Sequence, residues 1–498
     1  MTTSQSISHD LGVSGPLING EWLDKASLGD IDHIYPATAR VNGSVMLSGP
    51  EEVDAAVAAA KAAFPEWRAT SPDKRRRILQ KVEDLVEAHV AELGRLTVLE
   101  LGLPVGISMA LGHMTAGWFG YYAGWADKIE GATIPPSPAY FQGFDFTLRE
   151  PYGVVGIILT WNGPITSVGM KVAPALAAGN CVVVKTPEIA PYAVARFGEL
   201  ALEAGLPPGV LHILPGGPEA GDRLVRHPDV GKISFTGGMP TAQKILDAAR
   251  HTLKPVVLEL GGKTANLIFP DADLDAAVAE SVRSCFNLSG QGCNLNTRML
   301  VHRDVYGQAV EATRKAVAAL RVGDPFERET NLGPVVNQPA YDRILGVIDR
   351  ATSTDGARLV AGGHAVERSA LAPDLRDGYF IEPTVLADVD PYSDVAQREI
   401  FGPVLSIMPF ESEQEAVDLA NATPYGLGTA VQTRDVSRVF RLAPLLQSGN
   451  VHFNGSSGQS PGTPFGGYKQ SGLGREGGKE GLDEYLQTKN VYIRVPSA

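Results

Sequence analysis

Cysteine is scarce in this sequence. Among 498 residues it occurs only three times, as Cys181, Cys285 and Cys293. An odd and sparse set in a long chain is not the disulfide framework that staples small secreted proteins. The composition therefore predicts a reducing compartment, and we expect the protein in the cytoplasm.

Long apolar segments and an excess of basic charge are also missing. No stretch approaches the ~20 uncharged apolar residues that a membrane-spanning helix needs, and the polar N-terminus lacks the apolar core of a secretory signal. Acidic residues outnumber basic ones by 56 to 43, which gives a net charge of −13. We therefore expect neither a membrane nor a nucleic acid as partner.

Several enzyme signatures are absent too. The sequence contains no phosphate-loop motif, no HExxH and no GxSxG, and we expect no metal site. The dinucleotide fingerprint GxGxxG occurs as Gly472-Leu-Gly-Arg-Glu-Gly477. It neither follows a predicted strand nor opens a long βαβ unit. Because the fingerprint works only in that context, we do not interpret it as a cofactor loop.

Short apolar segments alternate with helical patterns between residues 151 and 260. Five strands separated by helices are typical of βαβ units and a parallel sheet. Such a sheet binds ligands at the carboxyl ends of its strands. The predicted strands are 154–159, 181–184, 210–214, 231–235 and 256–260.

A second alternating block follows, with strands at 265–269, 298–302, 403–407 and 449–453. The fold class is therefore α/β, with two α/β domains. Residues 17–24 predict a hairpin around Asn19-Gly20. Residues 129–150 predict a hairpin arm that leaves the body, and residues 490–494 predict a strand in the C-terminal tail.

Two residues attract attention by their surroundings. Cys293 lies in a small-residue turn, where a thiolate could attack a carbonyl, although a lone cysteine is more often a small buried hydrophobe. Cys181, in a predicted strand, and Cys285, two helical turns before Cys293, are interpreted as core. Glu259 interrupts an apolar strand, where burial is costly and raises a carboxyl pKa unless the group is paired or functional.

Seven short motifs occur in a fixed order, and together they are specific. They are Trp161-Asn-Gly-Pro164, Lys185-Thr-Pro-Glu188, Phe235-Thr-Gly-Gly238, Leu258-Glu-Leu-Gly-Gly-Lys263, Gly290-Gln-Gly-Cys293, Glu399-Ile-Phe-Gly-Pro403 and Pro464-Phe-Gly-Gly-Tyr-Lys-Gln-Ser-Gly-Leu-Gly474. With these motifs the chain resembles the NAD(P)-dependent aldehyde dehydrogenase superfamily from about residue 17 to about residue 493.

The resemblance implies a division of the chain. Residues 1–128 and 150–260 would form a Rossmann-like parallel-sheet domain that binds NAD. Residues 261–478 would form a second α/β domain that carries the nucleophilic cysteine. Residues 129–149 and 479–498 would form a β-arm and tail for oligomerisation, so we expect a homodimer or a dimer of dimers, that is, a homotetramer.

The resemblance also implies the oxidation of an aldehyde to a carboxylic acid with NAD. Cys293 would form a thiohemiacetal, whose oxyanion the Asn162 amide would stabilise. Hydride transfer would leave a thioester, and Glu259 would activate the water that hydrolyses it. A CoA-acylating enzyme and a non-catalytic binding homologue are the alternatives. Glu259 argues against the first, and the presence of all three residues argues against the second.

The implied cofactor residues form a longer set. Lys185 and Glu188 would hold the adenosine ribose, and Glu188 would repel a 2′-phosphate, which favours NAD and leaves NADP open. Glu399 would hold the nicotinamide ribose beside Phe401. The full set is Trp161, Lys185, Glu188, Gly217, Gly221, Phe235, Thr236, Gly237, Gly238, Leu260, Glu399 and Phe401.

Some positions depart from the family pattern. Thr160 replaces a common proline, and Gly238 replaces a common serine that donates to the pyrophosphate. Gly163 replaces a frequent phenylalanine of the substrate tunnel, so we expect a wider tunnel or a more mobile loop. The run Asn294-Leu-Asn296 after the cysteine is also unusual. The resemblance leaves the aldehyde unidentified.

Overall fold

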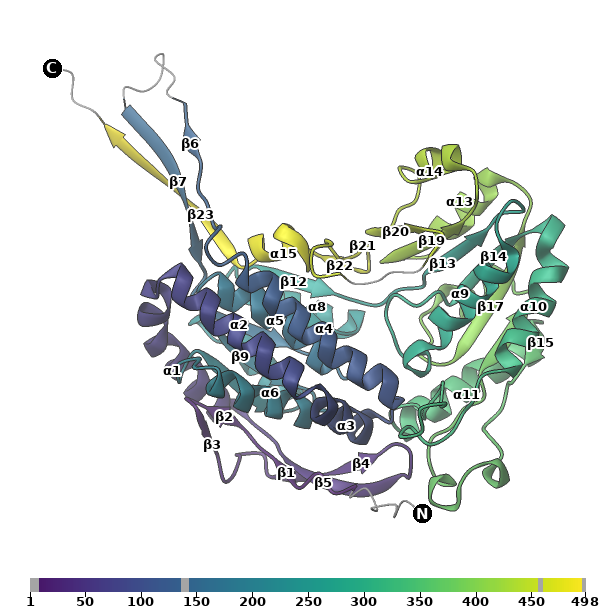
Figure 1. Cartoon of the computed structure of the whole chain (residues 1–498), viewed down its shortest axis with the longest axis horizontal. Helices are drawn as coiled ribbons and strands as arrows, with labels where there is room; N and C mark the ends of the chain where they lie inside the picture. Colours follow the sequence, from purple (N-terminus) through teal and green to yellow (C-terminus); the bar gives the residue numbers. More distant parts are fainter. Residues whose placement is uncertain (1–8, 136–142, 456–459, 495–498) are drawn as a thin grey trace.

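The computed structural model describes residues 9–135, 143–455 and 460–494. Two large sheets lie in separate halves of the molecule, and a narrow three-stranded sheet projects from the first half (Figure 1). No helix of these described ranges is long and apolar enough to cross a membrane.

The first sheet has eight strands in the order β22-β12-β11-β8-β9-β10-β2-β3. Its five central strands, β12 to β10, are parallel and confirm the five strands predicted from the sequence. They are almost entirely buried, which explains why they read as continuous apolar runs. The bounds are β22 Gly472–Leu473, β12 Val256–Glu259, β11 Val230–Thr236, β8 Val154–Ile158, β9 Cys181–Thr186, β10 Leu211–Pro215, β2 Leu17–Ile18 and β3 Glu21–Trp22.

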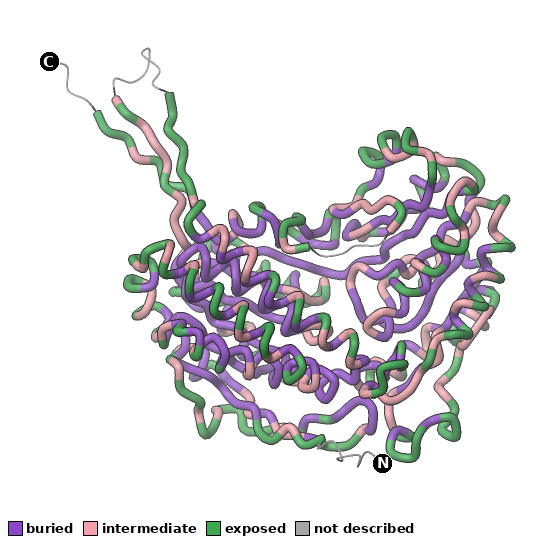
Figure 2. Tube along the Cα trace, viewed as in Figure 1, coloured by how far each residue is buried: buried purple, intermediate pink, exposed green. Residues whose placement is uncertain are grey.

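Helices cover both faces of this sheet. One face packs against α1 (Pro50–Ala69), α7 (Pro218–Arg226) and α8 (Met239–Ala249), and the other against α5 (Pro164–Ala177) and α6 (Tyr192–Glu203). A further layer lies over α5 and α6, so that α5 is almost fully buried (Figure 2). This layer consists of α2 (Pro72–Ala88), α3 (Val90–Leu101) and α4 (Val105–Ala123).

Residues 72–101, whose spacing of apolar residues is helical, form two helices and not one. His89 ends α2 and precedes α3. Its backbone N–H donates to the carbonyls of Leu85 and Val86, and its ring Nδ1 lies 2.8 Å from the Leu85 carbonyl oxygen. A side chain that competes for the helix carbonyls in this way favours a helix end.

The second sheet has seven strands in the order β15-β16-β17-β14-β13-β19-β20, and only β15 is antiparallel to its neighbour. The sequence predicted four of them and missed β15, β16 and β19. β15 is a partly exposed edge strand, and β19 begins with glycine and threonine, so neither presents a clear apolar run. The bounds are β15 Arg358–Ala361, β16 Thr384–Ala387, β17 Val404–Phe410, β14 Arg298–His302, β13 Ala265–Ile268, β19 Gly428–Gln432 and β20 Asn450–Phe453.

Two hydrophobic cores cover this second sheet, one on each face. One core includes α9 (Leu274–Phe286) and α10 (Tyr306–Ala318). The other includes residues of four helices, α11 (Gln338–Ser353), α12 (Asp394–Gln397), α13 (Glu413–Asn421) and α14 (Val436–Leu442).

Smaller strands complete the described fold. The predicted hairpin at Asn19-Gly20 is confirmed, since β2 and β3 pair antiparallel. A separate sheet has the order β1-β5-β4, and β18 pairs with β21. The bounds are β1 Val13–Ser14, β4 Asp30–Tyr35, β5 Arg40–Met46, β18 Tyr425–Gly426, β21 Tyr468–Lys469 and α15 Gly478–Asp483.

The projecting sheet joins two distant parts of the chain. β7 (Gly143–Pro151) pairs antiparallel with β6 (Thr133–Ile134) on one side and with β23 (Leu486–Arg494) on the other. The arm and the tail strand predicted from the sequence thus share one sheet, while residues 136–142 of the predicted arm lie outside the described residues. The division into domains stays a prediction, and β22 joins the first sheet although it comes from the range 261–478.

Candidate active site

The loop that carries Cys293 begins with an unusual backbone. After α9 ends at Phe286, the residues Leu288, Ser289 and Gly290 have φ angles of 52°, 54° and 75°. Left-handed backbone costs a residue with a side chain roughly 1–2 kcal/mol. Two such residues in a row, followed by a left-handed glycine, persist only where the surroundings hold them, and such strain is frequent at functional sites.

Buried hydrogen bonds hold this loop. The Ser289 hydroxyl donates to the Gly333 carbonyl at 3.0 Å, and the Gln291 side-chain oxygen accepts from the Val336 N–H at 2.9 Å. Both Ser289 and Gln291 are about 1% exposed. Sequence analysis missed these two anchors, because a polar residue beside a turn is commonplace without knowledge of what it faces.

Close backbone contact also fixes the loop. A Cβ on Gly290 would lie 2.2 Å from the backbone of Gly402, and a Cβ on Gly262 would lie 2.3 Å from the carbonyl oxygen of Cys293. Glycine is therefore required at both positions. The cysteine loop lies tightly against the ends of segments from both halves of the molecule.

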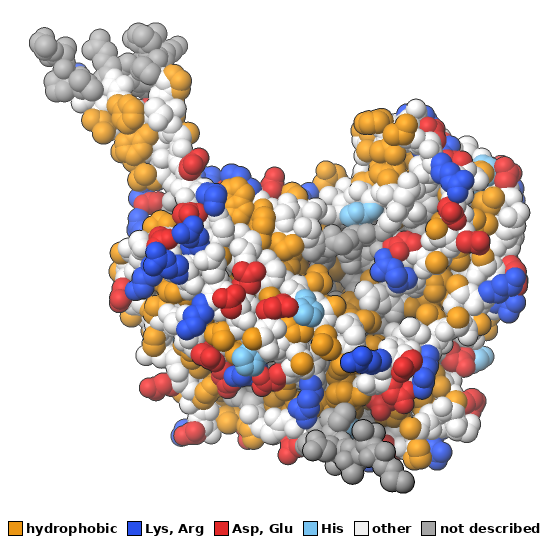
Figure 3. All heavy atoms as spheres, in the orientation of Figure 1, with side chains coloured by type: hydrophobic (Ala, Val, Ile, Leu, Met, Phe, Trp, Pro, Cys, Tyr) orange, Lys and Arg blue, Asp and Glu red, His pale blue; other side chains and the backbone are white. Residues whose placement is uncertain are grey.

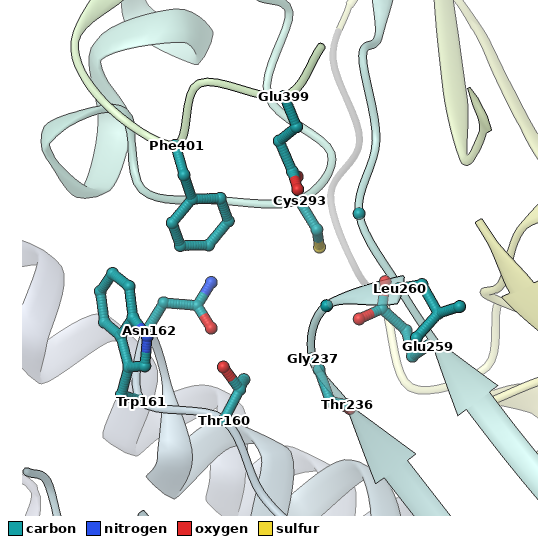
Figure 4. A pocket seen from close by; sticks show the side chains of 12 residues that line it. Thr160, Trp161, Asn162, Thr236, Gly237, Glu259, Leu260, Cys293, Glu399 and Phe401 are labelled. Carbon is teal, nitrogen blue, oxygen red and sulfur yellow. The ribbon is translucent and has the colours of Figure 1, made fainter. Parts of the chain in front are cut away.

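The three residues predicted as catalytic lie together. Asn162 follows β8, Glu259 ends β12, and Cys293 approaches from the second half, so that their side chains surround one cavity (Figure 4). The Asn162 amide donates to the Gln291 carbonyl at 3.0 Å, and the Cys293 thiol hydrogen-bonds with Glu259. The second amide hydrogen of Asn162 remains for another acceptor.

Burial governs the electrostatics of this group. It raises the pKa of the Glu259 carboxyl to about 8, and the charge of Glu476 raises this pKa further. Burial also raises the pKa of the half-buried Cys293 thiol well above its usual range, with further contributions from Glu259 and Glu399. At neutral pH the thiol therefore keeps its proton, and so does most of the Glu259 population.

A buried ion pair lies behind Glu259. The Lys171 ammonium of α5 hydrogen-bonds to the Glu476 carboxylate and donates to the Ser234 hydroxyl at 3.1 Å. The positive charge of Lys171 opposes the rise in the Glu259 pKa. The sequence did not predict this pair, although Lys171 is the single charged residue in the segment 164–178.

Two cavities meet at Cys293. One has a volume of about 200 Å³ and the other of about 310 Å³. The residues that line both are Thr160, Asn162, Thr236, Glu259 and Cys293. Groups that enter from opposite sides can therefore approach the thiol together.

The smaller cavity continues into a third, of about 420 Å³, along the strand ends of the first sheet. Lys185 Nζ lies 3.8 Å from a carboxylate oxygen of Glu188 in this third cavity. All twelve residues predicted to bind the cofactor line one of these two cavities. They are Trp161, Lys185, Glu188, Gly217, Gly221, Phe235, Thr236, Gly237, Gly238, Leu260, Glu399 and Phe401.

Helix ends at these cavities can hold an anion. Gly217 and Gly238 are the N-caps of α7 and α8, and neither helix has a side-chain cap. The first N–H groups of such helices are donors for phosphate oxygens. A pyrophosphate between a cation–carboxylate pair and the thiol thus fits the lining residues.

Glu399 and Phe401 also line the smaller cavity. Glu399 accepts from the Gly262 N–H at 3.0 Å, and burial raises its pKa to about 7. Phe401 has φ 55°, and its ring meets the Trp161 ring edge-on at 5.3 Å. A carboxyl and two aromatic rings in edge-on contact therefore line the same cavity.

The remaining candidates have other places. Gly472–Leu473 pairs with β12, and the fingerprint-like run to Gly477 lines neither of the two cofactor cavities. Cys181 and Cys285 are buried in the cores, as predicted. No group of three or more His, Cys, Asp or Glu that could hold a metal occurs within the described ranges.

Comparisons with known proteins agree with one another. A model of the aldehyde dehydrogenase family matches residues 22–491. Aminoaldehyde dehydrogenase 2, peroxisomal, from Pisum sativum is 40% identical over 481 residues, covering 95% of this chain and 94% of the relative. The structure of PnpE in complex with nicotinamide adenine dinucleotide has TM-score 0.94 and 38% identity, covering 97% and 98% of the two chains. A betaine aldehyde dehydrogenase from Staphylococcus aureus in complex with NAD+ has TM-score 0.93 and 35% identity, covering 97% and 98%.

The raised pKa of the Cys293 thiol predicts how the rate of its alkylation depends on pH. We expect iodoacetamide to modify Cys293 slowly at pH 7 and faster as the pH rises, because the thiolate is the nucleophile. Glu259→Gln removes a negative charge and should shift the alkylation rate profile to lower pH. The rate of alkylation at pH 8 should therefore increase ~3-fold or more. Intact mass over time measures the rate.

Two controls accompany this measurement. Cys293→Ser should remain unlabelled, since the other two cysteines are buried, and Glu188→Gln should leave the curve in place. An unchanged or upward-shifted curve for Glu259→Gln would refute the described contact between carboxyl and thiol.

Proposed function

The chain belongs to the aldehyde dehydrogenase family and oxidises an aldehyde with NAD, and from this premise we propose how its residues share the reaction. Cys293 is the nucleophile, Asn162 the oxyanion donor and Glu259 the general base. The observation that carries the proposal is their convergence where the two cavities meet.

The first step is addition of the Cys293 sulfur to the aldehyde carbon. The thiol proton passes to Glu259 in the ionised minority of molecules, since the Glu259 pKa of about 8 leaves a fraction of this carboxyl deprotonated at neutral pH and its side chain already hydrogen-bonds with the thiol. The carbonyl electron pair moves onto oxygen, where the free amide hydrogen of Asn162 and the Cys293 backbone N–H donate. One such donor is typically worth roughly 3–4 kcal/mol in the transition state.

The cofactor cavities fit NAD by their residues. Glu188 would accept from the adenosine ribose hydroxyls beside Lys185, the N-termini of α7 and α8 would hold the pyrophosphate, and Glu399 would hold the second ribose. NAD, when bound, accepts the hydride of the thiohemiacetal carbon, which becomes a thioester on Cys293.

Hydrolysis then needs a base for water. One oxygen of Glu259, Oε1, has no hydrogen-bond partner in the described part of the chain, and Glu259 lines both cavities. Once Glu259 has released the thiol proton to solvent, its carboxylate, with a pKa of about 8, is basic enough to take a proton from the attacking water. The hydroxide adds to the thioester carbon, the Cys293 sulfur leaves and regains a proton from Glu259, and the carboxylic acid is released. The charge of Glu476 raises the pKa of Glu259 and the charge of Lys171 lowers it, so the two effects oppose each other.

The alternatives receive less support. In a CoA-acylating enzyme a thiol accepts the acyl group, so a buried base beside the thioester would be unnecessary. A non-catalytic homologue would not need a strained loop that brings a thiol, an amide and a carboxyl together.

The cytoplasm remains our proposed location because all three cysteines are free, and detection of the protein only in an organelle fraction would refute it.

Substitution of the two reacting groups separates the steps. Cys293→Ala should reduce NADH formation from any aldehyde at least ~10⁴-fold and leave NAD binding intact, because it removes the covalent step. Glu259→Gln should slow steady-state turnover ~10²-fold or more while the acyl-enzyme accumulates. Stopped-flow NADH absorbance and intact mass measure the two effects. Wild-type turnover in Cys293→Ala, or undiminished acid release in Glu259→Gln, would contradict the mechanism.

Glu188 predicts a preference for NAD. A 2′-phosphate near this carboxylate is repelled, although Lys185 offers one cation to it. We expect kcat/KM to be higher with NAD than with NADP. Glu188→Gln should lower the ratio of kcat/KM with NAD to kcat/KM with NADP several-fold. A wild-type preference for NADP would refute this interpretation.

The projecting sheet suggests self-association. It has only three strands, and apolar side chains are exposed on it (Figure 3). An isolated small sheet with open edges is marginally stable in water and invites pairing. The exposed apolar residues are Ile134, Phe144, Leu148, Tyr492 and Ile493. We propose that it joins subunits into a homodimer or a dimer of dimers.

Light scattering coupled to size exclusion tests this assembly. At micromolar concentration we expect the mass of two or four chains of 52.8 kDa. The double substitution Phe144→Asp and Ile493→Asp should lower that mass, because buried carboxylates oppose association. A monomeric wild type would contradict the proposal.

A further inference from the structure

We propose that the substrate cavity favours uncharged aldehydes with a bulky group, aryl or branched, directly on the carbonyl carbon, and that Gly163 provides the room for that group. The substrate cavity is the one of about 310 Å³ described above. This inference rests on the proposed role of Cys293.

Two helix faces form the long walls of the substrate cavity. Each face has the spacing i, i+3, i+4, i+7, which places its members on one side of a helix. From α4 come Ile107, Ala110, Leu111 and Met114, and from the start of α5 come Gly163, Thr166, Ser167 and Met170. Small residues on both faces, namely Ala110, Gly163 and Ser167, leave the space between the helices open.

These walls are fixed relative to each other. The Thr115 hydroxyl of α4 donates to the Ile165 carbonyl at 3.0 Å, and the Thr166 hydroxyl of α5 donates to the Leu111 carbonyl at 3.2 Å. Buried hydrogen bonds in both directions oppose a collapse of the helices onto the open space. The room in the substrate cavity is therefore built into the helix packing.

Gly163 lies where this room matters for the reaction. It directly follows Asn162, the proposed oxyanion donor, and lines the substrate cavity together with Asn162 and Cys293. A Cβ at Gly163 would have no atom within 4 Å, and its φ of 178° is extended backbone. In contrast to Gly262 and Gly290, no close contact demands glycine here, and the missing side chain leaves space beside the reacting carbon.

The charges of the lining exclude anionic substrates. Glu259 and Glu476 are the ionisable carboxyls among the described lining residues, which include no Lys, Arg or His. A substrate carboxylate would lose its water without gaining a cation, since Lys171 is already paired with Glu476. Asn287, Asn294 and Ser167 offer neutral polar groups instead.

A substrate panel tests the inference on the whole enzyme. The wild type should oxidise benzaldehyde and 2,2-dimethylpropanal with kcat/KM at least equal to that for propanal. It should be ~30-fold or more less efficient with 4-carboxybenzaldehyde than with benzaldehyde, because the charge is not paired.

Gly163→Leu tests the residue. It should lower the kcat/KM ratio of benzaldehyde to propanal by ~30-fold or more, since the added side chain fills the space beside the carbonyl carbon. Gly307→Leu is the matched control, because Gly307 is an exposed α10 glycine with nothing within 4 Å of its Cβ, and it should leave the ratio unchanged. If Gly163→Leu fails to fold, Gly163→Ala and the wild-type panel decide the question.

The outcomes separate the two proposals. If the wild type oxidises no aldehyde of the panel, the proposed function fails. If it oxidises propanal but neither bulky aldehyde, or prefers 4-carboxybenzaldehyde, only the inference about the substrate cavity fails. A Gly163→Leu enzyme with an unchanged ratio overturns the assignment of Gly163.

Discussion

The site depends on contacts that cross between the two halves of the molecule. The Asn162 amide reaches the Gln291 carbonyl, and the Cys293 thiol reaches Glu259. Asn162 and Glu259 lie at strand ends of the first sheet, whereas the cysteine loop follows α9 of the second half. If either contact were lost, the thiol would face a cavity without a donor or a base. The strained turn at Leu288–Gly290 makes sense as the means of bringing the thiol to those strand ends.

Glycines near the site serve two different purposes. Gly262 and Gly290 are required because the backbones of Cys293 and Gly402 lie too close for a side chain. Gly163 has open space around it and an unremarkable φ. The glycines in close backbone contact hold the reacting groups in position, and a substitution there would move the backbone. The second kind shapes the cavity and can vary without displacing the reacting groups.

The pattern of apolar residues in the sequence predicted the strands that are covered by helices on both faces of a sheet, and little more. The five parallel strands of the first sheet were predicted because helices cover both faces and most of their residues are therefore apolar. β15 was missed because it is an exposed edge strand, and β19 because glycine, threonine and glutamine interrupt its apolar run. The residues around Cys293 were predicted through ordered motifs. The Lys171–Glu476 pair and the Gln291–Val336 contact were missed, because they join residues far apart in the sequence whose proximity only the fold creates.

Separation of the two cavities lets chemistry and selectivity vary independently. The cofactor side is built from strand ends and helix N-termini, whose donors are backbone groups and so tolerate little change. The substrate side is built from two helix faces tied by hydroxyl–carbonyl hydrogen bonds, where side chains alone set size and charge. Cys293, Asn162 and Glu259 line both cavities, so under our proposal a change at Ala110, Gly163 or Ser167 should alter which aldehyde enters without altering the reaction at the thiol. We therefore propose that the cavity faces of α4 and α5 select the aldehyde. The cysteine loop, with its unusual Asn294-Leu-Asn296 run, contributes only part of the wall of the substrate cavity.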